Sequence, residues 1–265
     1  MLRKLMHSRP TTILSIAGSD NTSGAGIQAD IKISKSLGAY CLTALTCVTS
    51  QNSDNIINVF NVPSNIVESQ INVSLKEYKV DGIKIGLITS LKTVKKICKS
   101  LKSYSKKIPI VVDPVYRSTN NRYFNKKNEY LKTSKELSKL NPFFTPNIFE
   151  ASILSNMKLN PKVSIEDILK NLGKIYRCNF VITGVEKKKN YYEDYLFFQK
   201  EIKTIRSKRI SSSSTHGTGC AFSTALTIYL AKGSNFFEAC KKAKSTINKK
   251  LKSSPRLGVK YGPLI

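Results

Sequence analysis

The chain has 265 residues, with 44 lysines and arginines against 17 aspartates and glutamates, so its formal net charge is +27. Hydrophobic residues make up 40% of it, a globular composition that excludes collagen-like, mucin-like and fully disordered proteins. No apolar run reaches the ~18 residues of a membrane span, because polar residues interrupt the best candidate, Cys220–Ala231. We therefore expect no membrane partner.

The cysteines and the charge indicate where the protein works. Six cysteines lie apart with no C-x-x-C pair, which favours free thiols in a reducing cytoplasm. The positive charge fits a nucleic-acid or anionic membrane partner. It fits equally the lysine-, asparagine- and isoleucine-rich composition that an A+T-rich genome encodes. We favour the second interpretation and expect no nucleic-acid partner, because the basic residues are scattered.

The predicted elements alternate along the chain after a short basic extension at residues 1–10. Strands are expected at Thr12–Ala17, Leu42–Thr49, Gly82–Gly86, Ile108–Asp113, Phe143–Thr145 and Asn179–Thr183, and a hairpin at Tyr191–Phe198 and Ile202–Arg206. Helices are expected at Ala25–Leu37, Ser64–Tyr78, Ser90–Tyr104, Lys126–Leu140, Ile148–Ser155, Ser164–Tyr176, Thr218–Ala231 and Phe236–Leu251. This order predicts one α/β domain over residues 11–265, with a mostly parallel central sheet and helices on both faces.

Ligands of such sheets bind beyond the carboxyl ends of the strands, so the residues that follow each strand are the candidates for a site. Gly18, Gln51, Gly86, Asp113 and Asn147 occupy such positions. Each of them, taken singly, is also an ordinary turn residue.

A glycine-rich segment, Gly24–Ala29, matches the G-x-G-x-x-A fingerprint of dinucleotide sites. Five residues separate Gly24 from Gly18 at the end of the preceding strand, and the next strand ends in Gln51 instead of an acid. We therefore do not expect a nicotinamide or flavin site. A Walker A loop is excluded, because no Gly-Lys-Ser/Thr occurs.

The second glycine motif is His216-Gly217-Thr218-Gly219-Cys220, which leads into an apolar helix. Unpaired N–H groups at a helix N-terminus form an anion hole, and a thiol at that position has a depressed pKa. The same pattern also fits a plain glycine loop before a buried helix, with Cys220 as a small core residue.

Carboxylates and an amide follow two other strands. Asn147 and Glu150 have the spacing of a capping box. They also have the chemistry to face nucleotide phosphates and Mg²⁺, which prefers oxygen ligands and retains waters. Asp113 could serve the same metal shell.

Together these motifs resemble the hydroxymethylpyrimidine/phosphomethylpyrimidine kinases of thiamine biosynthesis, which have the ribokinase-like fold. The resemblance rests on Ile16–Asp20, Ser23–Lys32, Leu37–Tyr40, Gln51-Asn52, Lys84–Gly86, Asp113–Val115, Thr145–Asn147, Glu150-Ala151 and Thr215–Cys220. It implies ATP- and Mg²⁺-dependent phosphorylation of 4-amino-5-hydroxymethyl-2-methylpyrimidine and then of its monophosphate, and a homodimer.

The resemblance also implies roles for individual residues. The pyrimidine pocket would use Gly18, Ala25, Asp30, Thr49, Gln51 and Leu87. The nucleotide would meet Asn147, Thr183, Thr218 and Gly219, and Asp113 and Glu150 would face Mg²⁺ through water. Gly217 and Gly219 would form the anion hole, with Cys220 aiding deprotonation of the substrate hydroxyl.

The sequence departs from the family's pattern at two places near the expected phosphates. Thr183 stands where a lysine is usual, and the segment Tyr116–Thr119 replaces Ala-Lys-Ser-Gly. Arg117 is a candidate to compensate for the lost lysine; otherwise turnover is slow. Two alternatives follow: a pyridoxal kinase of the same fold, and a pyrimidine-binding protein that no longer turns over.

Overall fold

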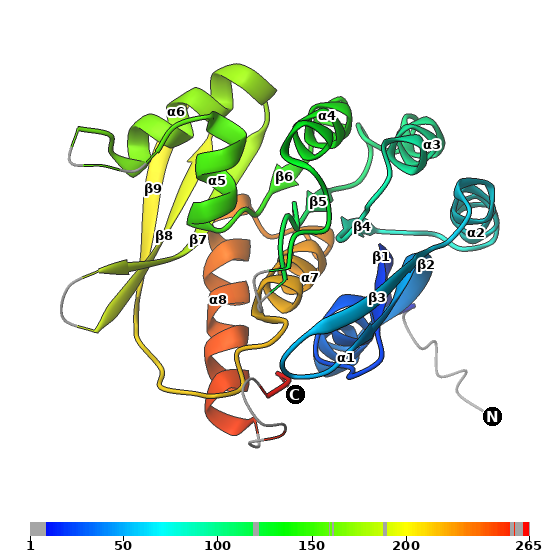
Figure 1. The fold of residues 1–265 in the computed structure, drawn as a ribbon, viewed down its shortest axis with the longest axis horizontal. Helices are drawn as coiled ribbons and strands as arrows, with labels where there is room; N and C mark the ends of the chain where they lie inside the picture. Colours follow the sequence, from blue (N-terminus) through cyan, green and yellow to red (C-terminus); the bar gives the residue numbers. More distant parts are fainter. Residues whose placement is uncertain are drawn as a thin grey trace, which may run out of the picture.

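The computed structural model describes residues 9–118, 122–158, 160, 162–187, 190–254, 257 and 262–264. Within these residues one sheet has the strand order β3-β2-β1-β4-β5-β6-β7-β8-β9 (Figure 1). The strands are β1 (Thr11–Asp20), β2 (Ala39–Gln51), β3 (Ile56–Asn61), β4 (Gly82–Ile85), β5 (Ile110–Val112), β6 (Phe143–Phe144), β7 (Asn179–Lys187), β8 (Tyr191–Phe198) and β9 (Glu201–Lys208). β1, β2 and β4 to β7 are parallel, whereas β3, β8 and β9 join by antiparallel pairing. The expected mostly parallel sheet is confirmed.

Helices cover both faces of this sheet. They are α1 (Gly26–Ser36), α2 (Ser64–Glu77), α3 (Leu91–Leu101), α4 (Lys127–Ser138), α5 (Ile148–Ser155), α6 (Ile165–Tyr176), α7 (Thr218–Ala231) and α8 (Phe236–Ser253). α2 to α6 bury apolar stripes on one face, where Ile71, Ile97 and Leu169 share a core. α1, α7 and α8 cover the other face, with Ile33 and Leu226 in a second core (Figure 1). The three-layer arrangement follows from parallel strands joined by crossover helices.

The two C-terminal helices differ in how they are buried. α8 buries Ala239, Ala243 and Ile247 and exposes Lys241 and Lys242, as the spacing of its apolar residues predicts. α7 is buried from Ala221 to Ile228, so its polar side chains need partners within the protein: the hydroxyl of Thr227 donates to the carbonyl of Ser223, one turn back in the same helix, at 2.8 Å. A helix enclosed in this way holds its N-terminus firmly at the edge of the sheet.

The expected strands and helices are all present, α5, α7 and β8 with the expected ends and the others with shifted ends, and one strand was missed. β3 pairs antiparallel with β2 and forms an edge of the sheet. None of the helices in the described part of the chain has the length and apolar character that a membrane crossing requires.

Candidate active site

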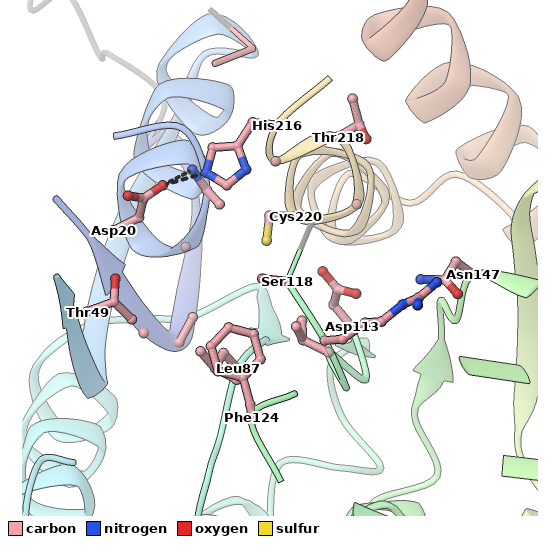
Figure 2. Close-up of a pocket in the computed structure, with 18 of the residues that line it drawn as sticks. Asp20, Thr49, Leu87, Asp113, Ser118, Phe124, Asn147, His216, Thr218 and Cys220 are labelled. Carbon is pink, nitrogen blue, oxygen red and sulfur yellow. Dashed lines mark hydrogen bonds and ion pairs between the residues drawn. The ribbon is translucent and has the colours of Figure 1, made fainter. Parts of the chain in front are cut away.

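A pocket of about 440 Å³ opens where the parallel strands end, between those ends and the turn that begins α7 (Figure 2). Nearly all the residues expected in the site line it: Gly18, Ala25, Thr49, Gln51, Leu87, Asp113, Asn147, Glu150, Thr183, Gly217, Thr218, Gly219 and Cys220. The topology explains this convergence, because parallel strands bring their carboxyl ends to one edge. What each residue binds stays a prediction.

Asp30 is the exception, and its placement in the pyrimidine pocket was wrong. It lies on α1 with no exposed surface, beneath the pocket. Its carboxylate accepts hydrogen bonds from Ser15 at 2.5 Å and Thr224 at 2.6 Å, and pairs with the Lys84 ammonium at 2.8 Å. The Lys84 ammonium also lies 3.0 Å from the other Asp30 oxygen, so four contacts from buried neighbours engage the carboxylate and leave no lone pair for a ligand.

Lys84, the partner of Asp30, is a fully buried lysine in β4 whose ammonium reaches the floor of the pocket. Burial opposes its charge, but the attraction of Asp30 keeps the Lys84 pKa above its ordinary value. A Cβ on Gly86 would come within 2.8 Å of the lysine nitrogen. The lone lysine in the apolar run Gly82–Ile85 was the sequence feature that could have revealed a buried charge.

The turn before α7 brings two glycine loops into contact. Gly217 caps α7 with φ +81°, a left-handed conformation that favours glycine. A Cβ there would overlap the carbonyl oxygen of Gly24, so both loops need their glycines for close approach. Gly219 is the second residue of α7. A Cβ built on it would lie 3.7 Å from an oxygen of the Asp113 carboxylate. The first residues of α7 thus border the pocket, where the motif predicts an anion hole.

Asp20 and His216 hold these loops together, and neither was among the expected site residues. The His216 Nε2 donates to the Asp20 carboxylate at 2.9 Å (Figure 2). The same carboxylate accepts from the backbone N–H groups of Gly24 at 3.1 Å and Ala25 at 2.8 Å. Burial opposes ionisation of Asp20, but the hydrogen bonds from His216 and Thr22 hold its pKa well below its ordinary value. Asp20 therefore stays ionised and fixes the loop between β1 and α1.

Cys220 lies in the first turn of α7, partly exposed, with its sulfur directed into the pocket (Figure 2). The expectation of a depressed pKa was wrong. Burial, with the nearby charges of Asp113 and Asp30, raises the pKa of the thiol to about 12 despite the opposing effect of Lys84. The thiol is therefore protonated near neutral pH, because the helix N-terminus does not offset this desolvation.

Asp113 and Glu150 form the acidic side of the pocket. Asn147 and Glu150 make the capping box of α5: each side chain accepts from the other's backbone N–H, at 2.9 and 3.0 Å. Glu150 also accepts from the Tyr116 N–H at 3.1 Å. Burial and the charge of Asp113 raise the pKa of Glu150 to about 8, and burial raises that of Asp113.

Glu150 caps α5, and together with Asp113 it has the chemistry to bind a cation as well. Two buried carboxylates that repel one another suit a hard cation, whose charge would stabilise both. Mg²⁺ is bound in proteins by one or two carboxylates together with substrate phosphates and waters. Asp113 and Glu150 therefore fit a magnesium ion, although the described residues contain no cluster of three or more acidic, histidine or cysteine ligands.

Comparison with known proteins decides the family. A phosphomethylpyrimidine kinase family model matches residues 20–265. The chain belongs to the phosphomethylpyrimidine kinase family. A hydroxymethylpyrimidine/phosphomethylpyrimidine kinase of Aquifex aeolicus is 32% identical over 94% of this chain and 97% of its own length. The expected family and the expected class of enzyme, a phosphotransferase, are confirmed.

Other relatives of the family carry further segments. A probable bifunctional thiamine biosynthetic enzyme of rice, Oryza sativa, is 33% identical over 95% of this chain. The chain spans 46% of the length of that relative. This chain is therefore similar to one part of the rice protein and not to its whole length.

Solved structures of similar fold include kinases named for two different substrates. An ADP complex of Bacillus subtilis pyridoxal kinase has a TM-score of 0.84 and 31% identity, over 96% of this chain and 97% of that one. A phosphomethylpyrimidine kinase of Clostridium difficile has a TM-score of 0.76 and 29% identity, over 90% of this chain and 98% of that one. The ribokinase-like fold is confirmed, and of these two structures the pyridoxal kinase has the higher TM-score and covers more of this chain.

The departures from the kinase family's pattern also lie in the pocket. Thr183 lines it on β7, and its N–H donates to the Pro146 carbonyl at 3.1 Å. Gly184 follows at φ +68°, and its N–H donates to the buried Asp194 at 2.7 Å. Arg117 lines the pocket as well, whereas Thr119 lies outside the described residues.

Proposed function

We propose that this kinase transfers the terminal phosphoryl group of ATP to the hydroxymethyl oxygen of 4-amino-5-hydroxymethyl-2-methylpyrimidine. It then phosphorylates the monophosphate to the diphosphate, as a step of thiamine diphosphate biosynthesis. The observation that carries the proposal is the pocket itself, in which the N-terminus of α7 lies opposite the carboxylates Asp113 and Glu150. An anion hole facing a cation-binding acidic side is what a transferring phosphoryl group requires.

The phosphate end of the pocket follows from the strand ends. Asn147, Thr183 and Thr218 would contact the nucleotide, and the N–H groups of Gly219 and its neighbours would hold the charge that develops on the phosphoryl oxygens. Asp113 and Glu150 would hold Mg²⁺ through water. A bound magnesium ion neutralises phosphate charge, which is the chemistry it supplies to phosphoryl transfer.

The pyrimidine end lies toward β1, β2 and β4. Gln51 can both donate to and accept from an aminopyrimidine edge, and Thr49, Gly18, Ala25 and Leu87 surround the space beside it. The hydroxyl proton would leave toward Cys220. Because the free thiol is protonated, this role requires that ligands neutralise the acidic neighbours that raise its pKa.

A pyridoxal kinase is the second candidate, favoured by the structural similarity to pyridoxal kinases of B. subtilis and Staphylococcus aureus, each with a TM-score of 0.84. Both of these pyridoxal kinase structures are complexes with ADP, which supports ATP as the phosphoryl donor of this chain. The fold therefore does not discriminate between a pyrimidine and a pyridine acceptor.

We also infer one kinase domain over residues 11–265, working as a cytoplasmic homodimer. The continuous sheet from β3 to β9 supports the single domain. Large apolar side chains left exposed on β2 and β3, Tyr40, Val48, Ile57 and Phe60, support self-association.

The test is ATP consumption by the purified protein with Mg²⁺, with hydroxymethylpyrimidine, its monophosphate and pyridoxal offered separately and the products identified by mass. We expect both pyrimidines to be phosphorylated. Turnover of pyridoxal alone would assign the chain to the second candidate. Pyrimidine binding without ATP consumption would instead indicate a binding protein that has lost turnover.

A further inference from the structure

The charges that line the pocket leave a problem for any polyphosphate ligand. Three carboxylates line it, those of Asp20, Asp113 and Glu150. Among the described lining residues, the cationic or potentially cationic side chains are Lys84, Arg117 and His216. A nucleotide phosphate chain entering this acidic space needs a positive side chain to meet it, in addition to a metal ion.

Two of these three side chains already have carboxylate partners. Lys84 is fully buried and its ammonium lies 2.8 and 3.0 Å from the two oxygens of Asp30. His216 donates to Asp20 at 2.9 Å. Their positive charge, where present, is balanced within the protein.

Arg117 is different. It is partly buried in the pocket wall, and no carboxylate of the described residues lies within ion-pairing distance of it. Its guanidinium carbon lies 3.7 Å from the centroid of the Phe149 ring, in the first turn of α5. Phe149 precedes Glu150, and the charge of Arg117 lowers the Glu150 pKa against the effect of burial. The guanidinium therefore stands over the acidic side of the pocket.

The backbone around Arg117 is held in place before any ligand arrives. The N–H of Tyr116 donates to the Glu150 carboxylate at 3.1 Å, and Arg117 forms a β-bridge with Tyr123. The Tyr116 ring packs on that of Tyr130 with centroids 4.4 Å apart. A guanidinium stacked on an aromatic ring is pre-organised and keeps its N–H edge free for phosphate oxygens.

Resting on the proposed function, we infer that Arg117 is a binding residue for the nucleotide phosphates. It supplies a positive charge to the lining of the pocket, which the neutral Thr183, another lining residue, does not. A guanidinium donates two parallel hydrogen bonds to phosphate oxygens, so it can replace an ammonium as the charge-neutralising group. The contact is to phosphate and is independent of the base.

The test measures binding of ADP and of adenosine by calorimetry, in the presence of Mg²⁺, to the wild type, Arg117→Gln and Arg117→Lys. Arg206→Gln is the matched control, because Arg206 also stacks on an aromatic ring, that of Tyr191 on β8, and lies outside the pocket. We expect Arg117→Gln to weaken ADP binding about 10- to 100-fold, the usual effect of a lost charged hydrogen bond. Adenosine binding should change less than about twofold, and Arg117→Lys should recover part of the ADP affinity.

Other outcomes separate the inference from the function on which it rests. Equal weakening of ADP and adenosine would show that Arg117 shapes the loop, and unchanged ADP affinity would remove it from the site; both overturn the inference. A fall in kcat/KM with the pyrimidine monophosphate but not with the unphosphorylated pyrimidine would move the contact to the acceptor and also overturn it. A wild-type protein that binds no ADP would overturn the proposed function itself.

Discussion

Cys220 lies in the first turn of α7, where that helix borders the pocket, so its chemistry can be tested separately from its packing. We expect Cys220→Ala to lower kcat about 10²- to 10⁴-fold, the range of a lost proton-transfer group. The urea midpoint should stay near that of the wild type, because the thiol is partly exposed and alanine suits a helix. Cys240→Ala provides the contrast: Cys240 is buried in α8, away from the pocket, so its loss should cost stability and leave kcat unchanged. Equal kcat in Cys220→Ala and wild type would remove Cys220 from the mechanism.

Glu150 should make the stability of the free enzyme depend on pH. Its folded pKa of about 8 exceeds the unfolded value, so between pH 4.5 and 8 the folded state holds a proton that the unfolded state has lost. This contribution to the free energy of unfolding is complete below the unfolded pKa and decreases as pH rises toward the folded pKa. Glu150→Gln cannot lose that proton, and its stability should fall less steeply from pH 5 to pH 8.

Urea unfolding of both proteins at several pH values measures this slope. The amide supplies one acceptor for two backbone donors, so the variant should be less stable at every pH, and the comparison is of slopes alone. Parallel stability curves would mean that Glu150 is ionised in the folded protein throughout this range.

The sequence predicted correctly that a residue lines the pocket where the residue's place along a strand decides this. Asp113 and Asn147 follow strands and line the pocket, because strand ends meet at one edge; Thr183 also lines it, from within the longer β7. Prediction failed for Asp30, because the neighbour that removes it from the pocket, Lys84, is 54 positions away in the chain. It failed for the Cys220 pKa for a related reason: the helix N-terminus can be read from local sequence, whereas desolvation depends on what the fold packs around the sulfur.

At the scale of elements, the turn into α7 offers a paired test of backbone geometry against chemistry. Gly217→Ala places a Cβ at φ +81° and into the Gly24 carbonyl, so it should lower the free energy of unfolding by roughly 2–4 kcal/mol. In Gly219→Ala the added Cβ lies at an ordinary contact distance from its nearest neighbour, and alanine is favoured over glycine in a helix. This variant should leave the free energy of unfolding unchanged or raise it by up to ~1 kcal/mol.

Turnover distinguishes the two variants in another way. The Cβ of Gly219→Ala lies on the pocket side near Asp113, so kcat should fall while the protein remains stable. Urea unfolding and ATP consumption on the same samples check both expectations. A stable and fully active Gly219→Ala would show that the first turn of α7 does not border the transferring phosphoryl group.

The elements themselves were largely predictable, and the missed one shows the limit. The helices have apolar stripes and the parallel strands are apolar runs, so their periods identify them. β3 has Ile56 buried but Ile57 and Phe60 exposed, so its pattern matches neither a half-buried nor a fully buried strand. Its pairing with β2 is fixed by tertiary contacts that local sequence does not encode.

For the whole molecule, the net charge of +27 and the exposed apolar residues of β2 and β3 have opposite effects on self-association. Repulsion between like-charged copies opposes a dimer and weakens as salt screens it. Burial of apolar surface favours a dimer and does not weaken in salt. The proposed homodimer should therefore be tighter at higher ionic strength, the reverse of the behaviour expected for binding to nucleic acid.

Phe60 provides the variant that tests this. Its side chain is 69% exposed on β3 and lies beside Val48, its partner on β2, which is 42% exposed. Phe60→Glu should shift sedimentation toward the monomer without changing the urea midpoint of the monomer, because the ring is not in the core. Leu257→Glu, which introduces the same charge at another exposed apolar residue, should sediment like the wild type. If both variants and the wild type sediment identically as dimers, the interface lies elsewhere; a monomeric wild type at all salt concentrations would contradict the homodimer.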